Sequence, residues 1–155
     1  MRLYYLCAMK LFCKGKNNSM NIEGKMIKCF DPLRRKYVAL TAEESVRQKF
    51  VRWLIDEKGY PAGLIGNEVT LNVGGLRRRC DTVVYSRYLK PWMIIEYKAP
   101  RVEITQEVFE QILRYNIALH AEYLVVSNGL RNFCCRITYS PLSYDFLDEI
   151  PEYIR

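Results

Sequence analysis

Apolar residues recur at helical spacing near the start of the chain and predict a first helix over about residues 42–58. Val46, Phe50 and Leu54 fall on one face of such a helix. The run Thr-Ala-Glu-Glu at 41–44 has the capping-box pattern that opens a helix, and a glycine and a proline soon after residue 58 end it.

Alternating apolar and polar side chains then predict three strands in succession. Residues 69–73 alternate, a Gly-Gly pair supplies a tight turn, and residues 77–85 form the return strand. Residues 92–98 form the third strand, which ends before Pro100 because proline cannot continue a hydrogen-bonded ladder. Residues 28–40, ahead of the first helix, are typical of a short turn and strand pair.

The second half of the chain predicts another helix followed by strands. Thr105 is placed to cap a helix that runs from residue 106 to about residue 121 along an apolar stripe. Residues 123–127 are almost all apolar, as expected of a parallel strand that is covered on both faces. Residues 133–139 predict a last strand, and residues 144–150 a short terminal helix. This order of elements predicts an α/β protein.

The composition indicates one folded domain. The chain has 155 residues and half of them are apolar, which is enough for a sizeable core. We expect the domain to span residues 26–155, and residues 1–25 to be a tail that is either disordered or upstream of a true start codon. The apolar run 3–9 is too short to span a membrane and no signal-peptide cleavage site follows it, so no membrane partner is expected.

The net charge and the cysteine pattern indicate which partners and which cellular compartment to expect. Lys plus Arg outnumber Asp plus Glu by 24 to 17, a net charge of +7 that favours polyanion partners, although many basic proteins bind none. The six cysteines contain no C-x-x-C pair and His120 is the only histidine, which argues against a structural zinc site. Because the sequence has no convincing secretory signal, reduced thiols and a cytoplasmic location are expected.

Three charged residues at strand ends are the main candidates for chemistry. Asp81 opens the apolar part of the second strand, while Glu96 and Lys98 end the third strand. Residues two apart in a strand point the same way, with Cα atoms about 6.6 Å apart. Carboxylates and an ammonium at the end of a buried sheet are costly unless their charge is compensated, and a divalent metal is one compensator. The plainer alternatives are a surface salt bridge at Asp81 and a structural ion pair of Lys98 with a carboxylate.

Polar residues on the two helices are secondary candidates. Glu44 either completes the capping box or is an additional acidic residue of the site. Gln111 and Tyr115 are four residues apart and share a helix face, which Arg114 flanks. Either Tyr115 is a core residue and Gln111 a rim residue, or both lean over the acidic cluster to hold a phosphate or the lysine.

These motifs carry a resemblance to a nuclease family. Asp81, the run Glu-Tyr-Lys at 96–98 and Gln111 with Tyr115 resemble the PD-(D/E)xK pattern with its trailing Q-xxx-Y element. The order of elements resembles that family's restriction-endonuclease-like αβββαβ core, a mixed central sheet flanked by helices. More narrowly, residues 29–129 are similar to the N-terminal nuclease domain of type I restriction enzyme R subunits.

The resemblance implies a role for each candidate residue. Asp81 and Glu96 would bind Mg²⁺, with Mn²⁺ as an alternative metal and the backbone carbonyl of Tyr97 as a further ligand. Lys98 would position or deprotonate the attacking water. Glu44 matches the acidic residue that many such nucleases carry on the first helix.

The same resemblance implies DNA as the partner. Gln111 and Tyr115 match the Q-xxx-Y element, which lies near the scissile strand. Arg77, Arg78, Arg79 and Arg114 would contact backbone phosphates without reading sequence. Restriction R subunits carry a helicase motor after this domain and this chain stops at Arg155, so a separate motor or specificity protein is an expected partner. A homodimer would supply two active sites for cutting both strands.

Three hypotheses therefore compete. The first is a Mg²⁺-dependent endonuclease that acts on DNA. The second is a non-catalytic nucleic-acid-binding or partner-docking module that keeps the fold. The third is a structural basic domain in which Asp81 and Lys98 form an ion pair.

Overall fold

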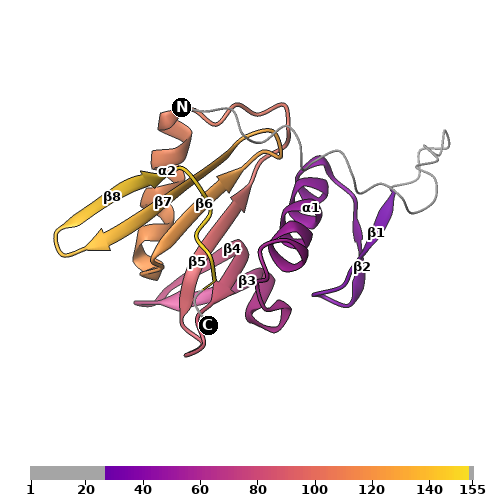
Figure 1. Cartoon of the computed structure of the whole chain (residues 1–155), viewed down its shortest axis with the longest axis horizontal. Helices are drawn as coiled ribbons and strands as arrows, with labels where there is room; N and C mark the ends of the chain where they lie inside the picture. Colours follow the sequence, from indigo (N-terminus) through magenta and orange to yellow (C-terminus); the bar gives the residue numbers. More distant parts are fainter. Residues whose placement is uncertain (1–26, 154–155) are drawn as a thin grey trace.

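The computed structural model describes residues 27–153, which form a mixed sheet, two α-helices and a separate strand pair (Figure 1). In chain order the strands and helices are β1 (Lys28–Asp31), β2 (Lys36–Ala39), α1 (Ala42–Asp56), β3 (Ile65–Val73), β4 (Leu76–Tyr85), β5 (Pro91–Tyr97), α2 (Gln106–Asn116), β6 (Tyr123–Ser127), β7 (Asn132–Tyr139) and β8 (Leu142–Leu147). The run α1-β3-β4-β5-α2-β6 confirms the predicted αβββαβ core. The predicted tail, residues 1–25, lies outside the described residues.

The main sheet has six strands in the order β3-β4-β5-β6-β7-β8. β5 and β6 are parallel, and every other neighbouring pair is antiparallel. The parallel pair arises because the chain leaves β5, forms α2 over one face of the sheet and returns to begin β6 at the same edge. The sheet is therefore mixed, as predicted.

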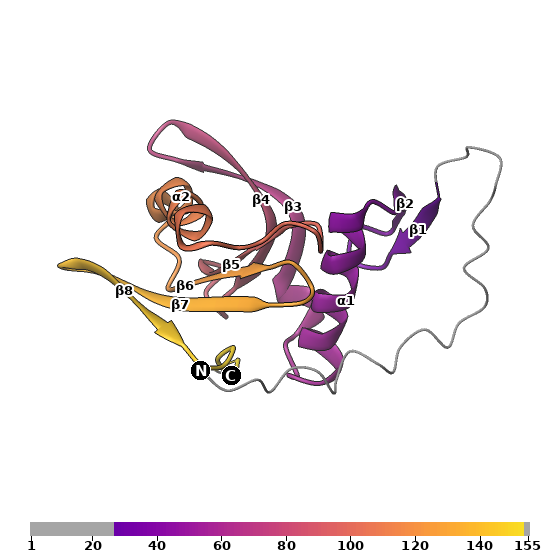
Figure 2. The same cartoon turned by 90° about the horizontal axis from the view of Figure 1, so that it is seen from above.

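The two helices cover opposite faces of this sheet. Along β5, Met93 and Ile95 pack in the cluster that contains α1, whereas Ile94 packs with α2. β6 repeats the alternation, with Val125 on the α1 side and Leu124 on the α2 side. Figure 2 shows α1 and α2 separated by the strands. Because both faces are covered, β6 is buried along its whole length, as its sequence predicts.

A threonine side chain caps the N-terminus of each α-helix. Thr41 accepts a hydrogen bond from the backbone N–H of Glu44 at 3.0 Å, and Thr105 accepts one from Val108 at 3.4 Å. α1 ends two residues earlier than the pattern predicts, and α2 gives way to a short 3₁₀ turn over Ile117–Leu119.

The predicted terminal helix over residues 144–150 is wrong, because β8 occupies Leu142–Leu147. β8 pairs antiparallel with β7 through the turn at Ser140 and Pro141. Tyr144 and Phe146 are two residues apart, the period of a strand, and both rings lie against Phe109 of α2 at 6.2 and 4.8 Å between centroids. Pairing with the neighbouring strand β7 and packing against α2 therefore outweighed the weak helical pattern.

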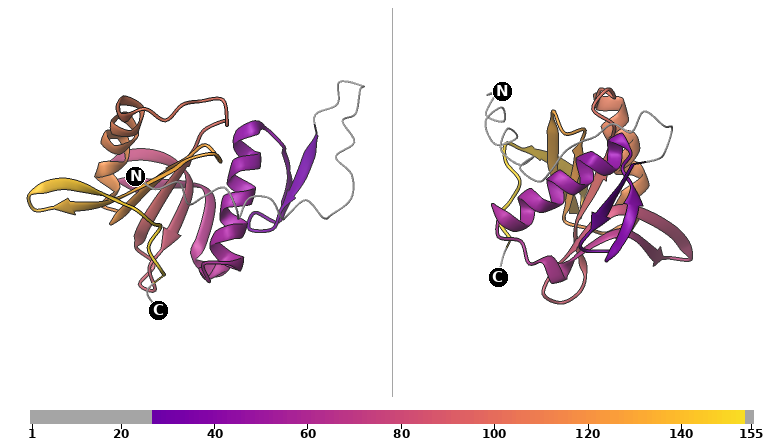
Figure 3. Two further views of the ribbon diagram at one scale, coloured as in Figure 1. Left: turned by 45° about the horizontal axis from the view of Figure 1, so that its top comes forward. Right: turned by 90° about the vertical axis from the view of Figure 1, so that its right-hand side faces the viewer.

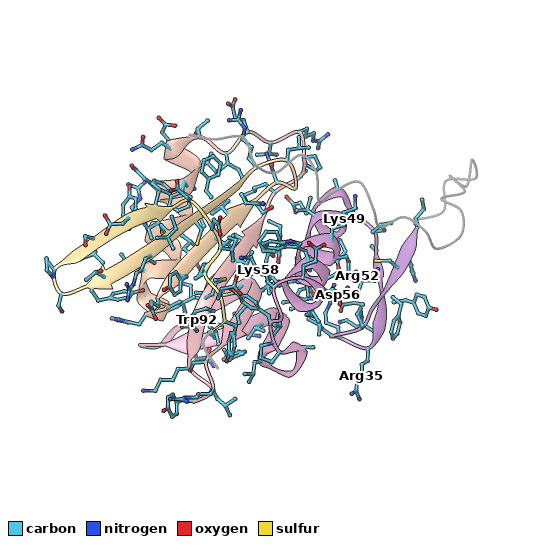
Figure 4. The ribbon with its side chains drawn as sticks, viewed as in Figure 1. Arg35, Lys49, Arg52, Asp56, Lys58 and Trp92 are labelled. Atoms are coloured by element: carbon cyan, nitrogen blue, oxygen red, sulfur yellow. The ribbon has the colours of Figure 1, made fainter. Side chains whose placement is uncertain are left out.

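An aromatic cluster closes the end of β5 where the strand begins. Trp92, labelled in Figure 4, packs its ring against Tyr60, Tyr123 and Tyr153 at 6.1, 5.1 and 5.4 Å between centroids. The hydroxyl of Tyr153 donates to the backbone carbonyl of Tyr85 at 3.0 Å. This cluster holds the last described residues to the sheet, at the opposite end of β5 from Glu96 and Lys98.

The β1–β2 pair lies beyond α1, on the side of that helix away from the main sheet (Figure 3). It pairs with no strand of the main sheet. Among residues 27–153, no helix combines the length and apolarity needed to cross a membrane.

The turn between β6 and β7 generates a first prediction. Gly129 has a left-handed φ of +79°, and a Cβ there would meet Val46 of α1 at 3.1 Å. We expect Gly129→Ala to lower the free energy of unfolding by about 1–2 kcal/mol, the cost of left-handed backbone for a residue with a Cβ. Chemical denaturation measures this change.

Gly63→Ala is the matched control, because a Cβ at Gly63 meets nothing within 4 Å. This control should leave stability unchanged or slightly raised. Equal stabilities for the two variants would contradict the prediction.

Candidate active site

Glu96 and Lys98 line one cavity under α2. The cavity has a volume of about 250 Å³, and its lining residues are Glu96, Lys98, Val108, Gln111, Ile112 and Asn116. The two charged residues share a face because they are two apart at the end of β5, as their spacing predicts. The other four come from successive turns of one face of α2, which leans over the strand end.

Asp81 reaches the same strand end from β4. Its Oδ2 accepts a hydrogen bond from the backbone N–H of Tyr97 at 3.0 Å, which fixes its carboxylate next to Glu96. Its Oδ1 accepts from Nη2 of Arg47 on α1 at 3.1 Å. Within residues 27–153 the cation paired with Asp81 is thus Arg47, so the hypothesised ion pair between Asp81 and Lys98 is wrong.

A local distortion of β3 and β4 aims Asp81 at this site. In a regular strand, residues three apart point to opposite faces. Cys80 and Val83 both pack on the α2 side, so the alternation of β4 is interrupted between them. Opposite this point, Glu68 of β3 has a left-handed φ of +54°, which is uncommon for a residue with a side chain. Distortions of this kind re-aim side chains near active sites.

The Glu96 carboxylate lacks full charge compensation. Burial, followed by the charge of Asp81, raises the pKa of Glu96 to about 8, against the opposing effect of Lys98. Glu96 Oε1 is buried and has no hydrogen-bond partner among the described residues. Burial also raises the pKa of the neighbouring Cys80 thiol to about 12, with Glu96 and Asp81 adding to the shift. Two adjacent carboxylates with one unpartnered oxygen are a favourable environment for a cation.

The donor set fits a divalent metal held by few protein ligands. Among the described residues, no three His, Cys, Asp or Glu side chains gather closely enough to hold one ion. Mg²⁺ nevertheless retains several waters and is commonly anchored by one or two carboxylates. Asp81 and Glu96 satisfy that requirement, and a role for the Tyr97 carbonyl stays a prediction.

Glu44 belongs to a buried charge network next to the site. It is 6% exposed, and its carboxylate accepts from Arg34 at 2.6 Å and from Arg47 at 2.7 Å. Arg34, from the turn after β1, also pairs with Asp31 and contacts Glu68 at 2.8 Å. Glu44 therefore connects to Asp81 through Arg47. Neither arginine was predicted as part of the site. Arg47 nevertheless lies three residues before Phe50 and seven before Leu54, on the helix face that packs in the core.

The remaining candidates are dispersed. Gln111 lines the cavity, and the side chain of Tyr115 lies outside the described part of the chain. Arg77, Arg79 and Arg114 are exposed, and Arg78 is half-buried. Arg79 pairs with Glu68 at 2.8 Å. No contact in the structure tests their predicted role in binding DNA.

A mixed sheet with helices on both faces, and acidic residues with a lysine at the end of its central strand, defines a restriction-endonuclease-like protein. Residues 42–151 match the model of the type I restriction enzyme R protein N terminus. The chain belongs to this family. A comparison with curated proteins found no match.

The raised pKa of Glu96 generates a prediction about pH. The folded state holds the Glu96 proton up to about pH 8, whereas the unfolded state loses it near its ordinary pKa of 4.5. As the pH rises from about 5 to about 8, the unfolded state loses this proton while the folded state keeps it, so the free energy of unfolding falls. Glu96→Gln should raise the melting temperature at pH 8 in EDTA and have little effect at pH 5. Gln111→Glu is the control, because it makes the opposite exchange, from amide to carboxyl, in the same cavity. It should not raise the melting temperature at pH 8.

If the effect of Glu96→Gln on the melting temperature did not change with pH, burial and Asp81 would not be raising the pKa of Glu96. Thermal melts at several pH values, with metal removed, measure the difference directly.

The charge network generates a prediction about stability. Arg47→Leu removes the cation shared by Glu44 and Asp81, and should lower the free energy of unfolding by about 3–5 kcal/mol, because Asp81 loses its cation and the buried Glu44 is left with Arg34. Arg136→Leu is the matched control, since the exposed pair of Arg136 with Glu122 at 3.0 Å should contribute about 1 kcal/mol or less. Urea denaturation that ranked the two variants equally would contradict the role of Arg47.

Proposed function

We propose that this domain is a metal-dependent endonuclease that hydrolyses phosphodiester bonds of DNA, with Mg²⁺ as the metal and Mn²⁺ as an alternative. The observation that carries the proposal is the pair of carboxylates, Asp81 and Glu96, with a lysine that lines the same cavity as Glu96. Membership of the R protein N-terminus family supports the same reaction class.

Each residue of the site has a separate task in this proposal. Asp81 and Glu96 hold the metal, which when bound polarises a phosphoryl oxygen and acidifies water. Arg47 and the Tyr97 backbone N–H donate hydrogen bonds to the two oxygens of Asp81 and so orient its carboxylate. Lys98 contacts the attacking water, while Gln111 faces the phosphate from α2.

DNA binding would use exposed cations on β4, α2 and α1. Arg77 and Arg79 project from β4, and Arg114 lies in the last turn of α2. Lys49 and Arg52 are exposed on α1 (Figure 4). Such side chains attract backbone phosphates irrespective of sequence. A motor or specificity protein would then select where the domain acts, a homodimer would permit cleavage of both strands, and the cytoplasm is the expected compartment.

A second candidate is a non-catalytic module that binds DNA or docks a partner. The observation that favours it is the contact between Arg47 and Asp81, because a guanidinium already supplies positive charge to one carboxylate. Hydrolytic activity separates the two candidates.

Plasmid cleavage tests the proposed function. The wild-type protein should nick supercoiled DNA with Mg²⁺ or Mn²⁺ and not with EDTA. Lys98→Ala should slow cleavage by about 10²–10⁴-fold, the usual effect of losing a group that assists proton transfer. Its affinity for DNA should change little, because Lys98 is half-buried in the cavity. Agarose gels and fluorescence anisotropy measure the two quantities.

Lys90→Ala, at an exposed lysine in the loop before β5, controls for the loss of one positive charge. Equal cleavage by Lys90→Ala and Lys98→Ala would contradict the role of Lys98. Tight DNA binding by the wild type without cleavage under any metal would favour the non-catalytic module.

A further inference from the structure

Asn116, the last residue of α2, shares the cavity with Glu96 and Lys98. It is 3% exposed, which is unusual for an asparagine. Its Nδ2 donates to the backbone carbonyl of Ile112 at 2.9 Å. Its Oδ1 is buried and has no hydrogen-bond partner in the described part of the chain. A buried amide oxygen without a partner typically costs about 1–3 kcal/mol, so this atom calls for an explanation.

The orientation of the Asn116 amide follows from its one protein contact. A backbone carbonyl only accepts hydrogen bonds, so the NH₂ group must face Ile112 and the oxygen must point elsewhere. The residue lines the cavity that Glu96 and Lys98 also line. The amide oxygen thus lacks a partner at the wall of that cavity, where a small shift of the side chain would let a ligand donate to it.

The cavity thus presents two acceptors and one donor. The acceptors are Asn116 Oδ1 and, in its ionised form, Glu96 Oε1, which both lack a partner among residues 27–153. The donor is the ammonium group of Lys98. A ligand that satisfies all three must donate two hydrogen bonds and accept one. Water does so, whereas a phosphate diester oxygen accepts from lysine and cannot donate to either oxygen.

We infer that Asn116 is a further residue of the site, which holds the hydrolytic water by accepting a hydrogen bond from it. The inference rests on the proposed nuclease function and assigns a residue outside the family pattern seen in the sequence. A water fills about 30 Å³ in the liquid, so a cavity of about 250 Å³ also has room for the phosphate.

Accepting a hydrogen bond from the water turns its oxygen lone pair away from Asn116 and toward the substrate. The water oxygen forms the new bond to phosphorus, and the bond from phosphorus to the leaving oxygen breaks. The water gives up a proton to solvent, and the leaving oxygen takes one from solvent. Asn116 itself is chemically unchanged.

A purely structural role for Asn116 makes a different prediction. Its Nδ2 contact with Ile112 completes the last turn of α2, and loss of that contact alone would loosen the helix end. The two halves of the amide can be separated by substitution. Asn116→Ser keeps a hydroxyl donor for the Ile112 carbonyl four residues earlier and loses the amide oxygen, whereas Asn116→Ala loses both.

The kinetic test compares these two variants with the wild type at saturating Mn²⁺ and saturating plasmid. Asn116→Ala should cleave about tenfold more slowly, the effect of one hydrogen bond of ordinary strength. Asn116→Ser should cleave as slowly as Asn116→Ala, since both lose the acceptor. DNA affinity should be unchanged in both, and Asn116→Ser should melt closer to the wild type than Asn116→Ala because its hydroxyl still donates to the Ile112 carbonyl. Cleavage by Asn116→Ser at the wild-type rate would overturn the inference.

A crystal structure of the wild-type protein, grown in EDTA, tests the inference without relying on activity. An ordered water within about 3 Å of both Asn116 Oδ1 and Glu96 Oε1 supports it. A protein donor on Asn116 Oδ1, or no water there, overturns it. If the water is present and the wild type cleaves no DNA, the water site stands and the proposed nuclease function fails.

Discussion

The guanidinium of Arg47 holds α1 against three strands of the sheet. It contacts Glu44 on its own helix, Glu68 on β3 at 3.4 Å and Asp81 on β4 at 3.1 Å. It also lies 5.8 Å from the ring centroid of Tyr97 on β5. Arg47 is 5% exposed, so these interactions act with little screening by water. A buried guanidinium is costly without partners. The same interactions therefore determine the position of α1, the left-handed backbone at Glu68 and the orientation of Asp81.

This network leaves Glu96 outside. Arg34 and Arg47 between them contact Asp31, Glu44, Glu68 and Asp81, whereas Glu96 lies on the α2 side with an unpartnered oxygen. The structure therefore separates carboxylates that stabilise the fold from one that is held at a cost. Such uncompensated charge is typical of functional sites, because a cation or substrate supplies the missing interaction when it binds.

α2 completes the site from the other face of the sheet. Thr105 caps its start, and Phe109 packs under the β8 aromatics, so the helix lies firmly over the end of β5. Its last turn brings Asn116 to the cavity that Glu96 and Lys98 line. The two faces thus differ: α1 supplies the guanidinium that orients Asp81, and α2 supplies polar groups to the cavity that Glu96 and Lys98 line.

Local periodicity in the sequence was sufficient to predict the αβββαβ core and the shared face of Glu96 and Lys98. Those features depend on residues within one helix turn or one strand, where the backbone repeat alone sets the direction of each side chain. It was insufficient for β8, which is a strand because it pairs with β7. Only the tertiary structure paired Asp81 with Arg47 and left the buried oxygen of Asn116 without a partner among the described residues. The contacts of a buried polar group come from distant parts of the chain, so no local pattern encodes which of them are satisfied.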